Sequence, residues 1–274
     1  MTRKLLPVAA AGAALGAAVL LSTRGAPSRE SLLPLSRTAA EHEKALDRAV
    51  GAAFPLTPDE ERAVGEKIDR SLKGAEPAPG TPDATAAARW RELAGDAARS
   101  ALVTRFRGRY EFRTTPDGGL NAFAVPGGFV YATLPLLRKL GEDVDALTFV
   151  AGHEIGHLEL GHCADAYRLR AGARDPITAA VGGALSVARL FAELHFSSAQ
   201  ELEADRFAVR LTRSLGRDPR GGLRAFDALG LPADKDTKRD PGAVAAEGLS
   251  DYFRTHPGSW ERRAAMEREI EATR

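Results

Sequence analysis

Apolar residues recur at helical spacing through most of this chain, so helices dominate the structure that it predicts. The clearest helix start is Thr57, an N-cap residue followed by Pro58 at the first helical position and by Glu60 in capping-box place. This helix is predicted to run to about Leu72. Further helices are predicted over 39–50, over 84–103, over 143–163, from Ser197 onward and over 264–272.

The hydrophobic period changes to two in one short central part of the chain. Aromatic residues alternate with arginines over 106–115, which predicts a strand. A turn over 116–119 and short strands over 120–125 and 129–133 follow. The whole pattern predicts an α+β fold, mainly helical, with one small sheet.

The predicted helix over 143–163 contains the sequence HEIGH, from His153 to His157. Residues four apart lie about 40° apart around a helix axis, so both histidines project from one face and can bind one metal ion. Glu154 lies one step round the helix, where it can reach a metal-bound water without being a ligand. Two imidazoles and a carboxylate base are the arrangement of zinc proteases.

A five-residue motif also arises by chance on solvated helices. Here Ala146, Val150 and Leu160 lie on the same face as the two histidines, which predicts that this face is buried. Two buried imidazoles need polar partners, and a shared metal ion supplies both.

Several downstream positions are candidates for a third ligand. One class of zinc proteases extends the motif to HExxHxxGxxH, but here Leu160 stands at the Gly position and Cys163 at the last His position, which excludes that class. On a continuous helix His162 lies about 140° further round than His157, so it is expected to be a capping or core residue. Glu201 is the remaining candidate, with His162 and His195 next in line.

Glu201 and Asp205 are four apart in the helix predicted to begin after Ser197, so they share one face. Two like charges at this spacing repel each other, whereas a metal ion and a histidine would stabilise them. Glu201 would then bind the metal, and Asp205 would accept the ring N–H of a ligand histidine. The alternative is a solvated acidic face that includes Glu203; the neighbouring HEIGH motif favours the ligand interpretation.

Four motifs resemble, in their order along the chain, those of metallopeptidase family 48. The resemblance extends over roughly 56–266. The motifs are NAFAVPGG at 121–128, HEIGH at 153–157, Glu201 with Asp205, and His256-Pro257 with Arg262.

The resemblance implies a zincin-type protease domain with one zinc ion per chain. The residues that match its zinc ligands are His153, His157 and Glu201. The residue that matches the catalytic base is Glu154, and Asp205 matches a residue that supports the ligands. The internal membrane spans and helical repeats that some members carry are missing here, so the resemblance does not define a substrate.

Two further sets of residues have roles implied by the resemblance alone. His256 and Arg262 are expected to lie near the metal, where they either stabilise the oxyanion of the transition state or gate the site by His256 taking the open zinc position. A sheet edge is expected over the metal helix, where it would pair with an extended substrate. Asn121, Ala122 and Phe123 are the candidate substrate-binding residues.

Composition adds little that changes this interpretation. Lys plus Arg is 38, Asp plus Glu is 37 and the formal net charge is +1, so nothing indicates a nucleic-acid partner. The single cysteine, Cys163, excludes a disulfide within the chain and is expected to be a small buried residue.

The N-terminal end has the pattern of an export signal. Arg3 and Lys4 precede an uncharged stretch, Leu5 to Leu21. Residues 1–26 are expected to form a cleaved signal peptide or an N-terminal membrane anchor, followed by a short segment over 27–55 and a catalytic domain over 56–274. No cysteine lies near the signal, so a lipoprotein is not expected.

Together these features predict an exported zinc-dependent endopeptidase of the periplasm, or one anchored to the membrane and facing the periplasm. Its partners would be peptides or proteins, such as envelope or misfolded proteins, and it would bind no nucleic acid. The alternative is a metal-stabilised, catalytically idle scaffold that binds envelope proteins. Glu154 argues against a scaffold, because a purely structural zinc needs no base.

Overall fold

The computed structural model describes residues 56–72, 76–116, 119–171, 196–230, 256 and 260–273. All of them belong to one compact unit, Lys44–Arg274. The predicted export signal, the segment over 27–55 and the predicted helix over 39–50 lie outside the described residues.

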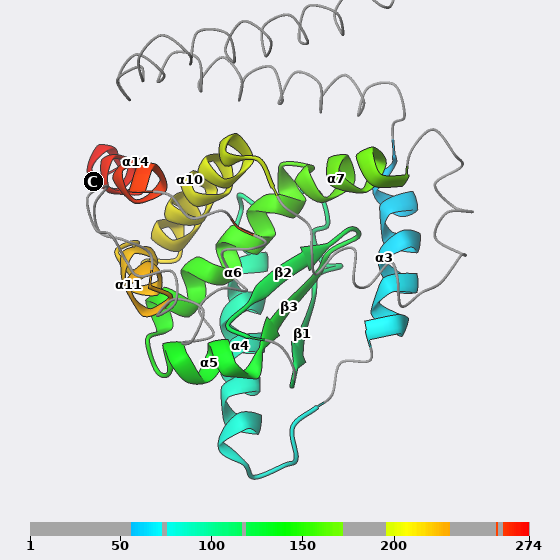
Figure 1. Ribbon diagram of the computed structural model, residues 1–274, viewed down its shortest axis with the longest axis horizontal. Coiled ribbons are helices and arrows are strands. Elements are labelled where there is room, and N and C mark those ends of the chain that lie inside the picture. The colour runs from blue at the N-terminus through cyan, green and yellow to red at the C-terminus, as the bar shows by residue number, and fades with distance from the viewer. Residues whose placement is uncertain are drawn as a thin grey trace, which may run out of the picture. The chain divides into compact units, whose positions relative to one another are not determined.

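Helices surround one small sheet in the described part of the chain (Figure 1). This confirms the predicted α+β class. In chain order the elements are α3 (Pro58–Leu72), α4 (Pro82–Ala98), β1 (Glu111–Thr115), β2 (Ala122–Val125), β3 (Phe129–Thr133), α5 (Leu134–Leu140), α6 (Val144–Glu159), α7 (His162–Ala171), α10 (Ser198–Ser214), α11 (Gly221–Ala228) and α14 (Trp260–Ala272).

The sheet has the order β1-β3-β2, so β2 is an edge strand. β1 runs parallel to β3, and β2 runs antiparallel to it. The Asn121 carbonyl accepts the Thr133 N–H at 2.9 Å and therefore points toward β3. Because successive residues of a strand alternate, the carbonyls of Ala122 and Ala124 point the other way, to the outer edge of β2.

Both faces of the sheet are covered. Ala122 and Ala124 pack into the larger core, which includes Trp90 of α4 and Ile155 of α6. The opposite face carries Phe123, which stacks on Tyr131 with 4.9 Å between ring centroids, and packs against α3. Figure 1 accordingly shows the sheet between α3 on one side and α6 with α4 on the other.

Helix α6 is the central element, and α10 packs closely along it. Two glycines make this approach close: a Cβ added to Gly152 would lie 3.3 Å from the Ala208 Cα, and one added to Gly156 would lie 3.3 Å from the Ala204 Cα. At its N-terminal end, α6 is tied to α11 because Arg224 pairs with Asp143. The backbones of α6 and α10 are thus close enough for side chains from both helices to meet at one point.

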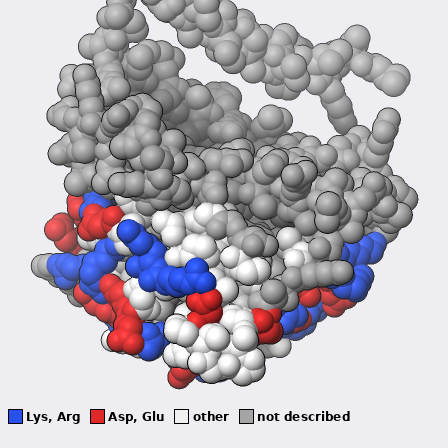
Figure 2. Space-filling view, turned by 60° about the horizontal axis from the view of Figure 1, so that its bottom comes forward, with Lys and Arg blue, Asp and Glu red and all other residues white. Residues whose placement is uncertain are grey.

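Acidic and basic side chains lie next to one another on the face of the molecule drawn in Figure 2. Elsewhere among the described residues, ion pairs connect elements that are far apart in the sequence. Arg138 of α5 pairs with Asp83 of α4, and Arg113 of β1 pairs with Asp69 of α3.

The helix predicted over 143–163 is shorter than predicted. It ends at Glu159, and the chain turns at Leu160 and Gly161, where Gly161 has a φ of +81°. A glycine with positive φ just past the last helical turn is a common helix stop. Leu160 was predicted to share the buried histidine face; it is 43% exposed because the helix has already ended.

Other boundaries also differ from the predicted ones. The helix predicted over 84–103 ends at Ala98, and the strand predicted over 106–115 begins only at Glu111. The Glu159 carboxylate explains the late start, since it accepts the N–H groups of Thr104 and Arg105 at 2.7 and 2.9 Å and holds the intervening chain in a turn. Helix α11 was missed altogether: it lies where the sequence indicated no helix.

Candidate metal centre

Helix α6 supplies three residues of the candidate site. His153, Glu154 and His157 are each 0% exposed. Their helix begins with Asp143 as N-cap, whose side chain accepts the Ala146 N–H. The predicted burial of the histidine face is therefore confirmed for its main part, including Ala146 and Val150.

Helix α10 supplies the acidic residues. Ser197 caps this helix in the predicted capping box with Gln200, with each side chain bonded to the other residue's backbone N–H. The cap sets where the first turn begins and so directs Glu201 toward α6. Glu201 is 0% exposed and Asp205 is 1% exposed, which excludes the solvated acidic face as an interpretation of these two residues.

The ligand atoms that the sequence indicated converge on one point. His153 Nε2 lies 3.1 Å from His157 Nε2 and 3.4 Å from Glu201 Oε2, and His157 Nε2 lies 3.4 Å from the other carboxylate oxygen, Glu201 Oε1. Zinc binds nitrogen and oxygen at about 2.0–2.1 Å in a tetrahedron, whose edges are then about 3.3–3.4 Å. The three side chains therefore fit a zinc-sized ion with little movement.

His256 approaches the same point from the C-terminal part of the chain. Its Nδ1 lies 3.3 Å from His153 Nε2 and 3.0 Å from Glu201 Oε1. Among the described residues, the group able to hold a metal ion consists of these four side chains: His153, His157, Glu201 and His256. His256 Nδ1 is thus a candidate fourth ligand atom beside the other three side chains.

The other nitrogen of His256 faces the sheet. His256 Nε2 lies 3.3 Å from the Ala122 carbonyl oxygen, which is one of the two carbonyls on the outer edge of β2. The same nitrogen is 3.5 Å from Glu154 Oε1. One imidazole therefore touches the ligand set and the edge strand.

The Glu154 carboxylate is buried beside the ligands. Within the described part of the chain, neither of its oxygens has a hydrogen-bond partner. Burial raises the pKa of Glu154 above its ordinary value, and the positive charge on the neighbouring histidines opposes that rise. A buried carboxylate with free lone pairs is suited to accept a proton.

Asp205 and Arg262 form a layer behind the ligands. Asp205 Oδ1 lies 3.0 Å from His153 Nδ1, the nitrogen that faces away from the metal position. Arg262 binds Asp205 through Nε and a terminal nitrogen at 2.8 and 2.7 Å, and its other terminal nitrogen lies 2.7 Å from Glu201 Oε2. A bidentate guanidinium of this kind fixes the orientation of the carboxylate that it binds.

The charges of this layer control the protonation of the ligands. Burial alone would raise the pKa of Glu201, but Arg262 and then the histidines hold it well below its usual range. Burial lowers the pKa of His157 well below its usual range. Burial acts in the same sense on His153, but Asp205 and Glu201 outweigh it and raise the pKa of His153 to about 9.

The predicted substrate-binding residues lie along the edge strand. Ala122 and Phe123 belong to β2, and Asn121 immediately precedes it. Only the backbone of Ala122 faces the site, through its carbonyl; the Phe123 ring lies on the opposite face of the sheet, against Tyr131.

His162 is the residue whose position the sequence interpretation missed. Its Nδ1 lies 3.0 Å from His157 Nδ1, although a continuous helix would have turned it away. The turn at Gly161 ends α6 and brings His162 back toward the ligands. The glycine one residue earlier was the available signal.

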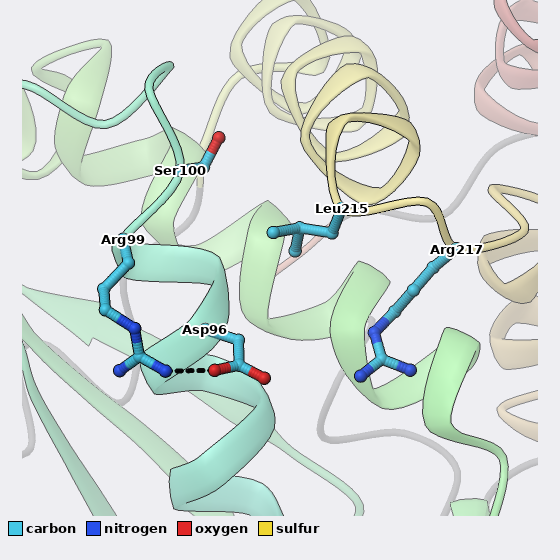
Figure 3. Close-up of a pocket in the computed structure, with 5 residues that line it drawn as sticks. All are labelled: Asp96, Arg99, Ser100, Leu215 and Arg217. Carbon is cyan, nitrogen blue, oxygen red and sulfur yellow. Dashed lines mark hydrogen bonds and ion pairs between the residues drawn. The ribbon is translucent and has the colours of Figure 1, made fainter.

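A hollow lies away from the candidate metal centre, on the surface at the C-terminal ends of α4 and α10. It encloses about 280 Å³ and is lined by Asp96, Arg99, Ser100, Leu215 and Arg217. Figure 3 shows Arg99 paired with Asp96, and Arg217 on the other side of Leu215. The hollow is open and brings together no ligand set, so it is not the candidate site.

The fold and the site define a zincin-type domain: a helix with HEIGH, a glutamate from a second helix, and an edge strand beside them. The chain matches the model of peptidase family M48 over residues 85–270. That range contains the four side chains of the metal-binding group and the edge strand. The chain belongs to peptidase family M48.

Two similar proteins carry names of the same kind. The chain is 28% identical over 158 residues to mitochondrial metalloendopeptidase OMA1 of Arabidopsis thaliana. This match covers 52% of this chain and 28% of that protein. It is 31% identical over 156 residues to metalloprotease LoiP of Escherichia coli strain K12. This match covers 52% of this chain and 56% of that protein. The matched regions therefore cover only part of each relative.

Proposed function

We propose that this chain is a zinc-dependent metalloendopeptidase. The observation that carries the proposal is the convergence of the His153 and His157 Nε2 atoms and the Glu201 carboxylate, with nitrogen–nitrogen and nitrogen–oxygen distances of 3.1–3.4 Å. Family membership supports the same class, and both named relatives are metalloproteases. Three protein ligands of this type are typical of a catalytic zinc site.

Zinc bound by these residues would act as a Lewis acid and lower the pKa of a water in its fourth position. Glu154 is placed to take a proton from the attacking water and to return it to the leaving amine. Its raised pKa serves both steps, since a base must also be able to act later as an acid. Asp205 holds His153 with Nε2 free for the metal.

The position of His256 favours the gating version of its two roles. Its Nδ1 lies 3.3 Å from His153 Nε2 and its Nε2 lies 3.3 Å from the Ala122 carbonyl oxygen, so the imidazole lies between the ligand residues and the edge strand, where a water and a substrate would bind. We propose that this arrangement is a resting state and that His256 moves away before cleavage. Arg262 helps to hold it, because a guanidinium nitrogen lies 3.4 Å from the His256 carbonyl oxygen.

The substrate is proposed to add as an extended strand along β2. The outer carbonyl of Ala122, which faces His256, is the group that a substrate backbone would bind there once His256 has moved, whereas the Ala124 carbonyl accepts the Cys163 thiol at 3.7 Å. Side chains of β2 point to the two packed faces of the sheet, so this binding would depend on the peptide backbone more than on substrate sequence.

We further propose that the enzyme is exported and acts on envelope or misfolded proteins, at or in the periplasm. The basic and then apolar N-terminal stretch supports export. Across the described ranges, no helix combines the length and the apolar character that crossing a membrane requires.

The proposal is tested with purified protein, wild type beside Glu154→Gln. We expect one zinc ion per chain in both proteins, by elemental analysis, because Glu154 is not a ligand. Casein cleavage should fall by about 10²–10⁴-fold in the variant, since the amide keeps the size of the side chain but removes the base. Wild-type protein without zinc, or a Glu154→Gln variant with full activity, would contradict the proposal; an inactive wild type with zinc would support the scaffold alternative.

A further inference from the structure

Each metal-binding histidine has a second nitrogen, and the two histidines use it differently. His153 Nδ1 lies 3.0 Å from Asp205 Oδ1. His157 Nδ1 instead faces another imidazole, with His162 Nδ1 at 3.0 Å. His162 Nε2 then lies 3.3 Å from Glu203 Oε2. A chain of contacts thus leads from His157 through His162 to a carboxylate on α10.

When the Nε2 lone pair of His157 binds a metal, only one arrangement of protons makes both contacts hydrogen bonds. The proton of neutral His157 must then lie on Nδ1, where it can be donated to His162 Nδ1. His162 must be neutral and carry its proton on Nε2, because a protonated Nδ1 could not accept. The Nε2–H of His162 then donates to Glu203, whose carboxylate accepts without needing a proton of its own.

We propose that His162 and Glu203 are positioning residues that orient His157 for metal binding, as Asp205 does for His153. The proposal rests on the zinc function proposed above. Hydrogen bonds to the far nitrogen of a ligand histidine fix its ring and its tautomer and raise its basicity. The two supports differ in strength: Asp205 places a buried charge directly on its histidine, whereas Glu203 acts through a neutral ring and is 28% exposed.

The surroundings of His157 agree with a fixed ring. Phe196 stacks on it with 3.8 Å between ring centroids and 19° between planes. His162 is only 3% exposed, so water does not compete freely for its nitrogens. His162 is also not an alternative metal ligand, because it contacts the ring nitrogen of His157 that faces away from His153.

The contacts from Glu203 through His162 to His157 form a relay. Zinc affinity, measured by competition with a chelator, tests each contact of this relay separately. His162→Leu removes both contacts and should weaken zinc binding by about 10–100-fold, the usual effect of losing such a support. His162→Asn places an amide oxygen near the former Nδ1 and should recover most of the affinity. Glu203→Gln should cause a smaller loss than His162→Leu.

The combination of His162→Leu with Glu203→Gln tests whether Glu203 acts through His162. The double variant should bind zinc no more weakly than His162→Leu alone. The matched control is Glu269→Gln, which also removes a mostly buried carboxylate that binds α10, through Arg210, but touches no ligand. It should leave zinc affinity unchanged.

Two further measurements exclude a merely structural role. The thermal midpoint of the metal-free His162→Leu protein should stay close to that of metal-free wild type. Long-range proton–nitrogen NMR of zinc-loaded wild type should show His157 protonated at Nδ1 and His162 protonated at Nε2 only. Equal zinc affinity in wild type, His162→Leu and Glu203→Gln would overturn the relay, as would a proton on His162 Nδ1.

Failure of the relay is distinguishable from failure of the proposed function. A wild-type protein that binds no zinc would refute both. A wild-type protein that binds one zinc ion and cleaves casein, while His162→Leu binds zinc equally well, would refute the relay alone. If His162→Leu does not fold, Glu203→Gln in the otherwise wild-type chain and the NMR measurement of His162 still test whether the link to Glu203 contributes to affinity.

Discussion

At the residue scale, the buried pair of Asp205 and Arg262 links the metal ligands to one another. Asp205 contacts His153, and Arg262 contacts both Asp205 and Glu201. Three charges buried together stabilise a site only when each has its partners, because a charge left alone loses its solvation without compensation. Changes to either residue should therefore reach the metal.

Asp205→Asn should lower zinc affinity by about 10–100-fold, because the amide is a weaker acceptor for His153 and leaves Arg262 to compete for Glu201. Chelator titration measures the change. The control is Asp227→Asn, which breaks the ion pair between the next arginine, the buried Arg263, and an exposed carboxylate that is remote from the ligands. Wild-type affinity in Asp205→Asn would mean that Asp205 supports the fold and has no effect on the metal.

His256→Ala distinguishes the two roles of this residue. If His256 closes the site at rest, the variant should keep its zinc on three ligands and cleave casein faster than wild type. If His256 stabilises the transition state, kcat should fall with zinc retained. We expect faster casein cleavage, since His256 Nδ1 lies 3.3 Å from His153 Nε2 and 3.0 Å from Glu201 Oε1. Unchanged turnover at equal zinc content would contradict both roles.

At the element scale, helix α3 is held against the turn between β2 and β3 by a close backbone approach. A Cβ added to Gly65 would lie 1.9 Å from the Pro126 carbonyl oxygen, and one added to Gly127 would lie 2.5 Å from the Arg62 Cα. Gly127 also has a positive φ of +86°, which other residues rarely adopt. The helix and the turn therefore fit only without side chains at these positions.

Gly65→Ala should destabilise the protein by about 1–3 kcal/mol, because a rigid backbone carbonyl cannot move aside for the new methyl group. Urea unfolding of the metal-free protein measures the change. Gly95→Ala is the matched control in α4, where the added methyl group meets only the end of the Arg99 side chain at 3.5 Å. It should stabilise by about 0.5–1 kcal/mol through helix propensity. Equal stability of the two variants would refute the close approach.

At the scale of the whole molecule, the partly buried Tyr110 and the buried Tyr131 connect the sheet region to helices on both of its faces. The Tyr110 hydroxyl donates to Glu159 of α6, and the Tyr131 hydroxyl donates to Asp69 of α3. Burial, followed by the nearby carboxylates, raises the pKa of both tyrosines. The folded protein therefore favours their protonated form more strongly than the unfolded chain does.

This predicts a loss of stability in alkali. A raised folded-state pKa contributes stability that is full below the unfolded value of about 10 and decreases as the pH rises through the folded value. The thermal midpoint should change little between about pH 8 and 9 and fall steeply above about pH 10. Tyr131→Phe should lower the midpoint at neutral pH and reduce the steepness of the alkaline fall. An equally steep fall in Tyr131→Phe would show that other groups cause it.

The sequence alone determined the features that depend on neighbours along the chain. Capping residues placed the starts of α3 and α10, and the four-residue spacing placed His153 with His157 and Glu201 with Asp205 on shared helix faces. It did not determine where α6 ends, because the glycine stop was read as part of the helix. That single turn decides whether His162 faces His157 or points away from it.

Only the tertiary structure decided which of these groups meet. The approach of α6 to α10 at Gly152 and Gly156 brings Glu201 to the histidines, and a position more than fifty residues further along the chain brings His256 to the same point. Such contacts depend on how helices pack, which periodicity cannot specify, since it shows the buried face of each helix and not the partner of that face. The physical reason is that spacing along one helix orders side chains locally, whereas the distances between ligands depend on the backbone separation of different elements.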